Sequence, residues 1–157
     1  MLAKNKSLFG VLLFGSLLTT TFSACNKDDD TPAEKVNYTI SATANGSQEV
    51  PAVTTAGTGT ATGTYNKNTN LLNYTVTWTG LSGNATLMHF HGPADPGVSA
   101  GVSLGITGFT SAPSGSYTGS ATLTDDQETQ LLGGKWYYNV HTAAHGAGEI
   151  RGQVSLQ

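Results

Sequence analysis

Residues 135–153 read KWYYNVHTAAHGAGEIRGQ, which predicts a strand, a tight polar turn and a return strand. Because side chains alternate between the two faces of a strand, this segment has one apolar and one polar face. The apolar face is expected to point into a core and contains Trp136, Tyr138, Val140, Ile150 and Gly152, with Val154 continuing it just beyond the segment. The outward polar face contains Tyr137, Asn139, His141, Glu149, Arg151 and Gln153.

The other stretch that contains histidines is residues 85–96, ATLMHFHGPADP. Met88 and Phe90 form its natural core pair, so His89 and His91 lie together on the opposite face. If the two segments form neighbouring strands, one polar surface collects seven side chains, the last of them from the turn: His89, His91, Asn139, His141, Glu149, Arg151 and His145. All four histidines of the protein are therefore expected at one place.

This histidine cluster has two interpretations. In the first it is a metal site, since imidazole suits copper and zinc, and copper is favoured over zinc. The ligands would be His89, His91, His141 and His145, with ring tautomers fixed by Asn139, Glu149 and Arg151. In the second, the same residues form a hydrogen-bonded network that only fixes the strand ends and the turn. Ring nitrogens that converge on one point would favour the metal site.

The chain from residue 37 onward is rich in Thr, Gly, Val, Tyr and Ser, which favours strands and turns. Residues 72–79, LNYTVTWT, alternate cleanly between apolar and polar side chains. Strands are predicted at 38–44, 57–65, 71–79, 85–91, 102–106, 116–123, 136–141 and 148–156, a hairpin turn at 66–70, and one short helix at 124–132. Short strands without crossover helices predict an all-β fold, an antiparallel Greek-key β-sandwich.

Three segments carry a family resemblance: HFHGPA at 89–94, Ala100-Gly101-Val102, and WYYNVHTAAHGAGEIRGQ at 136–153. They resemble the signature segments of the CHRD (chordin-type) domain, over roughly residues 38–156. The resemblance implies a sandwich that is immunoglobulin-like or Cu,Zn superoxide dismutase-like. The pair His89 and His91, completed by His141, also looks like half of the dismutase copper site, although the dismutase's disulfide pair is absent.

The N-terminus has the features of an export signal, with Lys4 and Lys6 before an apolar run that is shorter than the roughly 20 residues of a spanning helix. FSAC resembles a lipobox, so residues 1–24 are expected to be a lipoprotein signal peptide and Cys25 the lipid-attachment site. An acidic tether at 25–36, with Asp28-Asp29-Asp30, would lead to the domain at 37–157. The expected location is the cell envelope, as a surface-exposed outer-membrane lipoprotein.

The charge distribution and the motifs argue against several classes of function. The domain has no basic patch, so nucleic acid is not an expected partner. His141 and His145 have H-x-x-x-H spacing without the glutamate of a zinc protease, and G-x-S-x-G at 97–101 has no helix after it. No catalytic residue and no enzymatic activity are therefore expected. The function expected is a binding or structural module for an envelope or extracellular macromolecule, with copper or zinc binding as the alternative.

Overall fold

The computed structural model describes residues 34–157. The predicted signal peptide, Cys25 and the tether up to residue 33 lie outside the described residues. The described elements are β1 (Asn37–Asn45), η1 (Gly46–Gln48), β2 (Thr58–Asn66), β3 (Leu71–Thr79), β4 (Ala85–His91), β5 (Val102–Ile106), β6 (Gly115–Thr122), α1 (Asp125–Leu132), β7 (Tyr137–Thr142), β8 (Ile150–Gln153) and β9 (Ser155–Leu156). None of the helices in this part of the chain is long and apolar enough to cross a membrane.

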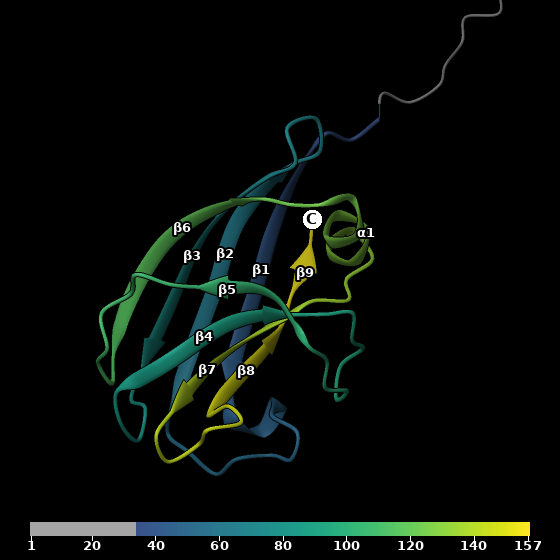
Figure 1. Ribbon diagram of the computed structural model, residues 1–157. Coiled ribbons are helices and arrows are strands. Elements are labelled where there is room, and N and C mark those ends of the chain that lie inside the picture. Colours follow the sequence, from purple (N-terminus) through teal and green to yellow (C-terminus); the bar gives the residue numbers. More distant parts are fainter. Residues whose placement is uncertain (1–33) are drawn as a thin grey trace, which may run out of the picture. The chain divides into compact units, whose positions relative to one another are not determined.

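The strands are antiparallel and follow the order β5-β4-β7-β8-β1-β2-β3-β6, with β9 beside β1. They form two layers, one of β1, β2, β3 and β6 and one of β4, β5, β7 and β8 (Figure 1). The layers are joined by the pairing of Asn45 with Arg151. Strand β6 returns to pair with β3, and β7 returns to pair with β4. These returns are Greek-key connections, so the predicted all-β antiparallel sandwich is confirmed, as a nearly closed one.

The core follows from the alternation along each strand. In β3 the inward side chains Leu72, Val76 and Trp78 are buried, while Asn73 and Thr79 are exposed. The apolar face predicted for residues 135–153 is also buried: Trp136, Tyr138, Val140 and Ile150 are all in the core. Burying one such side chain contributes about 1.5–3 kcal/mol to the stability of the folded domain.

Local sequence signals explain where α1 begins and how the hairpin between β2 and β3 turns. Thr124 is the N-cap of α1, and its side chain and that of Gln127 form a reciprocal capping box. Asn70 has a φ of 54° between β2 and β3, a left-handed conformation that asparagine tolerates.

The predicted last strand at 148–156 is in fact two short strands. Strand β8 pairs with β7, whereas β9 pairs with β1. Between them, the Val154 N–H donates to the Trp136 carbonyl. The strand is interrupted because the chain passes from one layer to the other at this residue.

Candidate metal centre

Three histidines converge on the outer face of β4 and β7. In this pairing His89 lies opposite Asn139, and His141 lies two positions further along, opposite Leu87. One ring nitrogen from each of His89, His91 and His141 lies within 4.8 Å of the others. The closest pair is His89 Nδ1 and His141 Nε2, 3.1 Å apart. We call these residues the three-histidine cluster.

Backbone carbonyls set the tautomers of two of these rings. His141 Nδ1 lies 3.1 Å from the carbonyl oxygen of Gly146, and His91 Nδ1 lies 3.0 Å from that of Ala100. A carbonyl oxygen only accepts hydrogen bonds, so the proton of each neutral ring is on Nδ1. Each Nε2 then keeps a lone pair, which is the state that a metal ligand needs.

The remaining nitrogen of His91 faces a further oxygen. His91 Nε2 lies 3.0 Å from Asn139 Oδ1, a buried amide oxygen on β7. A neutral imidazole has a single N–H and cannot donate to both Ala100 and Asn139. A metal ion at Nε2 would complement the Asn139 oxygen.

Burial and mutual repulsion favour neutral imidazoles here. Burial, together with the nearby His141 and His91, lowers the pKa of His89 below its ordinary value. Burial also lowers the pKa of His141, against a smaller opposing contribution from the Gly146 carbonyl. Neutral rings are the form that binds metals, so these shifts preserve ligand capacity at neutral pH.

His145 is not part of the three-histidine cluster. It lies in the turn after β7, where its backbone N–H donates to Thr142 and its carbonyl accepts from Gly148. The ring nitrogens that lie within 4.8 Å of one another belong only to the other three histidines, so this predicted ligand is not brought to them.

Five of the seven side chains of the predicted polar surface are buried. His91, Asn139, His141, Glu149 and Arg151 are all less than 9% exposed. The loop at residues 92–101 contributes to this cover, because its carbonyls accept hydrogen bonds from side chains of the face. Alternation predicted the side on which His91, Asn139, His141 and Arg151 lie, but it gives no information about loops that cover a sheet.

Glu149 has a different role from the predicted one, since it contacts no imidazole. Its carboxylate accepts hydrogen bonds from the hydroxyls of Thr55, Ser82 and Thr142 and from the Ser82 N–H, at 2.6–2.7 Å. Burial opposes ionisation, but these four donors outweigh it and lower the pKa of Glu149 to about 2. Glu149 therefore ties two loops to the end of β7.

Arg151 also contacts no histidine. Its guanidinium donates to the Val98 carbonyl and lies over the ring of Tyr137, 3.4 Å from the ring centroid. Tyr137 in turn is stacked on His91. Of the three predicted partners of the imidazoles, only Asn139 has a side-chain atom within hydrogen-bond distance of a ring.

Comparison with models of known protein families identifies the family of this chain. The family model described as the CHRD domain matches residues 40–154, which include all three residues of the three-histidine cluster. The chain belongs to the CHRD domain family. No curated protein and no solved structure matches it. Membership in this family indicates a binding or structural module. The matched region of this CHRD domain also includes the loop at residues 92–101, which covers the polar face.

One residue near the site had no signal in the sequence. Glu49 follows η1 and is buried, and burial raises its pKa to about 7, partly offset by Arg151. It lies outside any strand, so no periodic pattern marked it. The only hint was an acidic residue next to the turn-forming Asn45-Gly46-Ser47, in a domain that has few charges.

Proposed function

We propose that this CHRD domain binds a copper ion through His89, His91 and His141. The observation that carries the proposal is the approach of three ring nitrogens to within 4.8 Å of one another. The carbonyls of Gly146 and Ala100 hold the distal nitrogens of two rings, which supports lone pairs directed into the cluster.

Copper is the metal that fits this donor set best. Sites of nitrogen ligands bind divalent copper more tightly than zinc, and imidazole is a good ligand for both. The three-histidine cluster also has no cysteine or carboxylate in it. Zinc commonly takes a fourth ligand in a structural site. We propose binding for uptake or storage rather than an enzymatic role.

The test is a titration of the purified full-length chain with Cu(II), Cu(I) and Zn(II), followed by competition with a chelator of known affinity. We expect one equivalent of copper to bind at submicromolar Kd, and zinc to bind more weakly. His89→Ala and His141→Ala should each lower the copper affinity at least tenfold. Electron paramagnetic resonance of the Cu(II) form should show coupling to imidazole nitrogens.

His145→Ala is the matched control. It removes an imidazole from the same turn while leaving the three-histidine cluster intact, so the copper affinity should not change. Copper binding that is indifferent to His89→Ala and His141→Ala would overturn the proposal. Loss of binding in His145→Ala alone would place the metal in the turn instead.

We further propose that the module is held at the outer membrane by lipid on Cys25, with an envelope or extracellular macromolecule as a partner. The lipobox-like FSAC and the acidic residues after it support this location. Cys25→Ala should release the protein from the membrane fraction, and globomycin should block its processing. A variant that stays fully membrane-bound would show that the lipid anchor is wrong.

A further inference from the structure

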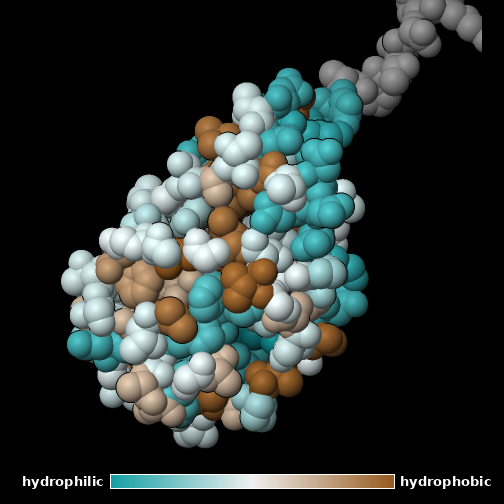
Figure 2. Space-filling model, in the orientation of Figure 1, coloured by the Kyte–Doolittle hydropathy of each residue, from teal (hydrophilic) through white to brown (hydrophobic). Residues whose placement is uncertain are grey.

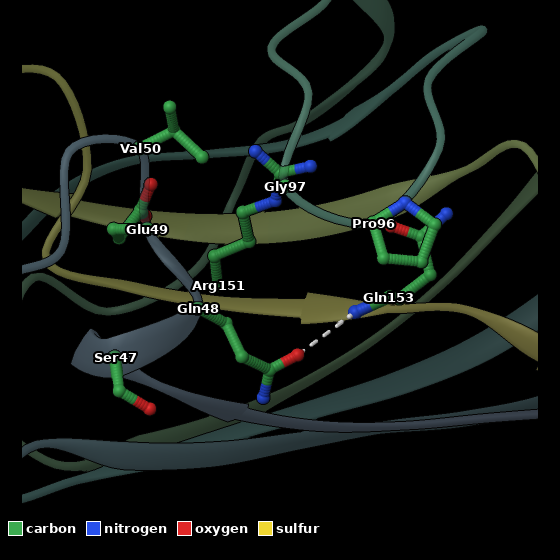
Figure 3. Close-up of a pocket in the computed structure, with 8 residues that line it drawn as sticks. All are labelled: Ser47, Gln48, Glu49, Val50, Pro96, Gly97, Arg151 and Gln153. Carbon is green, nitrogen blue, oxygen red and sulfur yellow. Dashed lines mark hydrogen bonds between the residues drawn. The ribbon is translucent and has the colours of Figure 1, made fainter.

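A cavity of about 210 Å³ lies beside β8. Its wall comes from three parts of the chain: η1 and the residues after it, the 92–101 loop, and β8 itself. Figure 3 shows Glu49, Val50 and Pro96 placed around the side chain of Arg151. No histidine lines the cavity, so it is distinct from the three-histidine cluster.

The cavity contains a buried cation that forms no ion pair. Arg151 is 2% exposed. The ion pairs among residues 34–157 are Lys67 with Glu34 and Lys135 with Asp95, and neither involves Arg151. The one hydrogen bond found for its guanidinium is donated to the Val98 carbonyl. A buried charge is costly unless it is paired, so this guanidinium is complementary to an anion.

Glu49 does not supply that anion. It lines the same cavity but forms no ion pair with Arg151, and its Oε1 has no hydrogen-bond partner. Burial raises the pKa of Glu49 to about 7, so a large share of the carboxyl is neutral at neutral pH. A neutral carboxyl group can donate a hydrogen bond to a bound oxyanion.

The walls indicate the rest of the ligand. Val50 and Pro96 are apolar, and Val50 is 42% exposed at the rim. Gly97 adds no side chain to the space. In Figure 2 the hydrophobic residues of the visible face occur in small groups separated by polar ones.

We propose that this cavity binds a small monocarboxylate with a short apolar group. The carboxylate would pair with the planar fork of Arg151, and the apolar group would lie against Val50 and Pro96. A single cation in the lining matches one negative charge, which disfavours a phosphate dianion. The proposal is independent of copper binding.

The test is calorimetric titration of the full-length chain with benzoate, benzamide and inorganic phosphate, in a buffer free of carboxylates. Benzoate should bind saturably, whereas its neutral isostere benzamide and phosphate should bind at least tenfold more weakly. Arg151→Lys keeps the charge but loses the fork, and should weaken benzoate binding at least tenfold. Val50→Glu should do the same by placing a negative charge at the rim.

Val102→Glu is the matched control, because Val102 is similarly exposed, at 56%, but does not line the cavity. It should bind benzoate like the unmodified chain. Val50 is at the surface, so Val50→Glu remains informative even if Arg151→Lys does not fold. Equal binding of benzoate and benzamide, tighter binding of phosphate, or unchanged benzoate binding in Val50→Glu would each overturn the proposal.

Discussion

Tyr137 lies parallel to His91, with ring centroids 4.8 Å apart and an interplanar angle of 4°. The Tyr137 hydroxyl lies 3.2 Å from the N–H of Ala100 and accepts a hydrogen bond from it. The carbonyl of the same residue faces His91 Nδ1. One tyrosine therefore supports both the His91 ring and the loop that covers it.

Replacing Tyr137 separates the role of the ring from that of the hydroxyl. Tyr137→Phe keeps the stacked ring and should cost about 1–2 kcal/mol of unfolding free energy for the two lost hydrogen bonds to Ala100. Copper affinity should then change less than threefold. Tyr137→Ala should cost about 3–5 kcal/mol and lower the copper affinity about tenfold, because His91 loses its support. Urea unfolding and chelator competition measure both effects, and equal copper affinities in the two variants would contradict the role of the ring.

Gly148 and Gly146 lie in the same turn but have opposite tolerance for a side chain. Gly148 has a φ of 133°, and a Cβ there would overlap Glu49 Oε1 and lie 2.8 Å from Asn139 Nδ2. A Cβ at Gly146 would meet nothing within 4 Å. We expect Gly148→Ala to destabilise the domain by about 2–4 kcal/mol and Gly146→Ala to change stability by less than about 0.5 kcal/mol. Thermal unfolding of the two variants checks this, and similar costs would refute it.

Glu149 should make stability dependent on acid pH. Its pKa is lowered from 4.5 to about 2 in the folded domain. The stabilisation is therefore complete above the unfolded value and is lost as the pH falls from about 4.5 toward 2. Glu149→Gln should cost about 2 kcal/mol at pH 7, and this cost should shrink as the pH falls. Urea unfolding of both proteins at pH 7, 4 and 3 measures it; a cost that is constant with pH would count against an ionised Glu149.

Glu49 should have the opposite effect. Its pKa is raised from 4.5 to about 7 in the folded domain. Ionisation is thus penalised by folding, and stability decreases as the pH rises from about 4.5 to 7, then levels off. Glu49→Gln, a neutral isostere, should be more stable than the unmodified domain at pH 8 by on the order of 1 kcal/mol, because Arg151 offsets part of the burial penalty. The two should be equally stable near pH 4. A variant that is less stable at pH 8 would contradict a buried carboxyl of raised pKa.

Much of the fold could be predicted because its information is local. The alternation in β3 and the capping residues of α1 depend on neighbours in the sequence, and both elements were found within one residue of their observed ends. The convergence of His89, His91 and His141 was also predictable. Residues two apart share a face of a strand, so it required only that β4 and β7 be neighbours.

The rest depends on contacts between distant segments that leave no period in the sequence. The 92–101 loop covers the polar face through its backbone carbonyls, which any residue type provides. Glu149 precedes β8, so its position does not follow from the alternation of that strand. Its partners Thr55 and Ser82 come from loops. The cavity at Arg151 likewise requires three separate segments to meet.

Asn139 offers the sharpest test of how the cluster is positioned. Its Oδ1 lies 3.0 Å from His91 Nε2, and its Nδ2 donates to the Ala147 carbonyl at 3.5 Å. Asn139→Ala removes the oxygen that would face copper bound at His91 Nε2 and leaves all three imidazoles in place, so copper affinity should fall about 10–100-fold while one equivalent still binds. Asn73→Ala, at an exposed asparagine of β3, is the control and should bind copper like the unmodified chain. Chelator competition measures the affinity, and nitrogen couplings in electron paramagnetic resonance report the ligand set. Unchanged affinity in Asn139→Ala would show that His91 is positioned by the Ala100 carbonyl and Tyr137 alone.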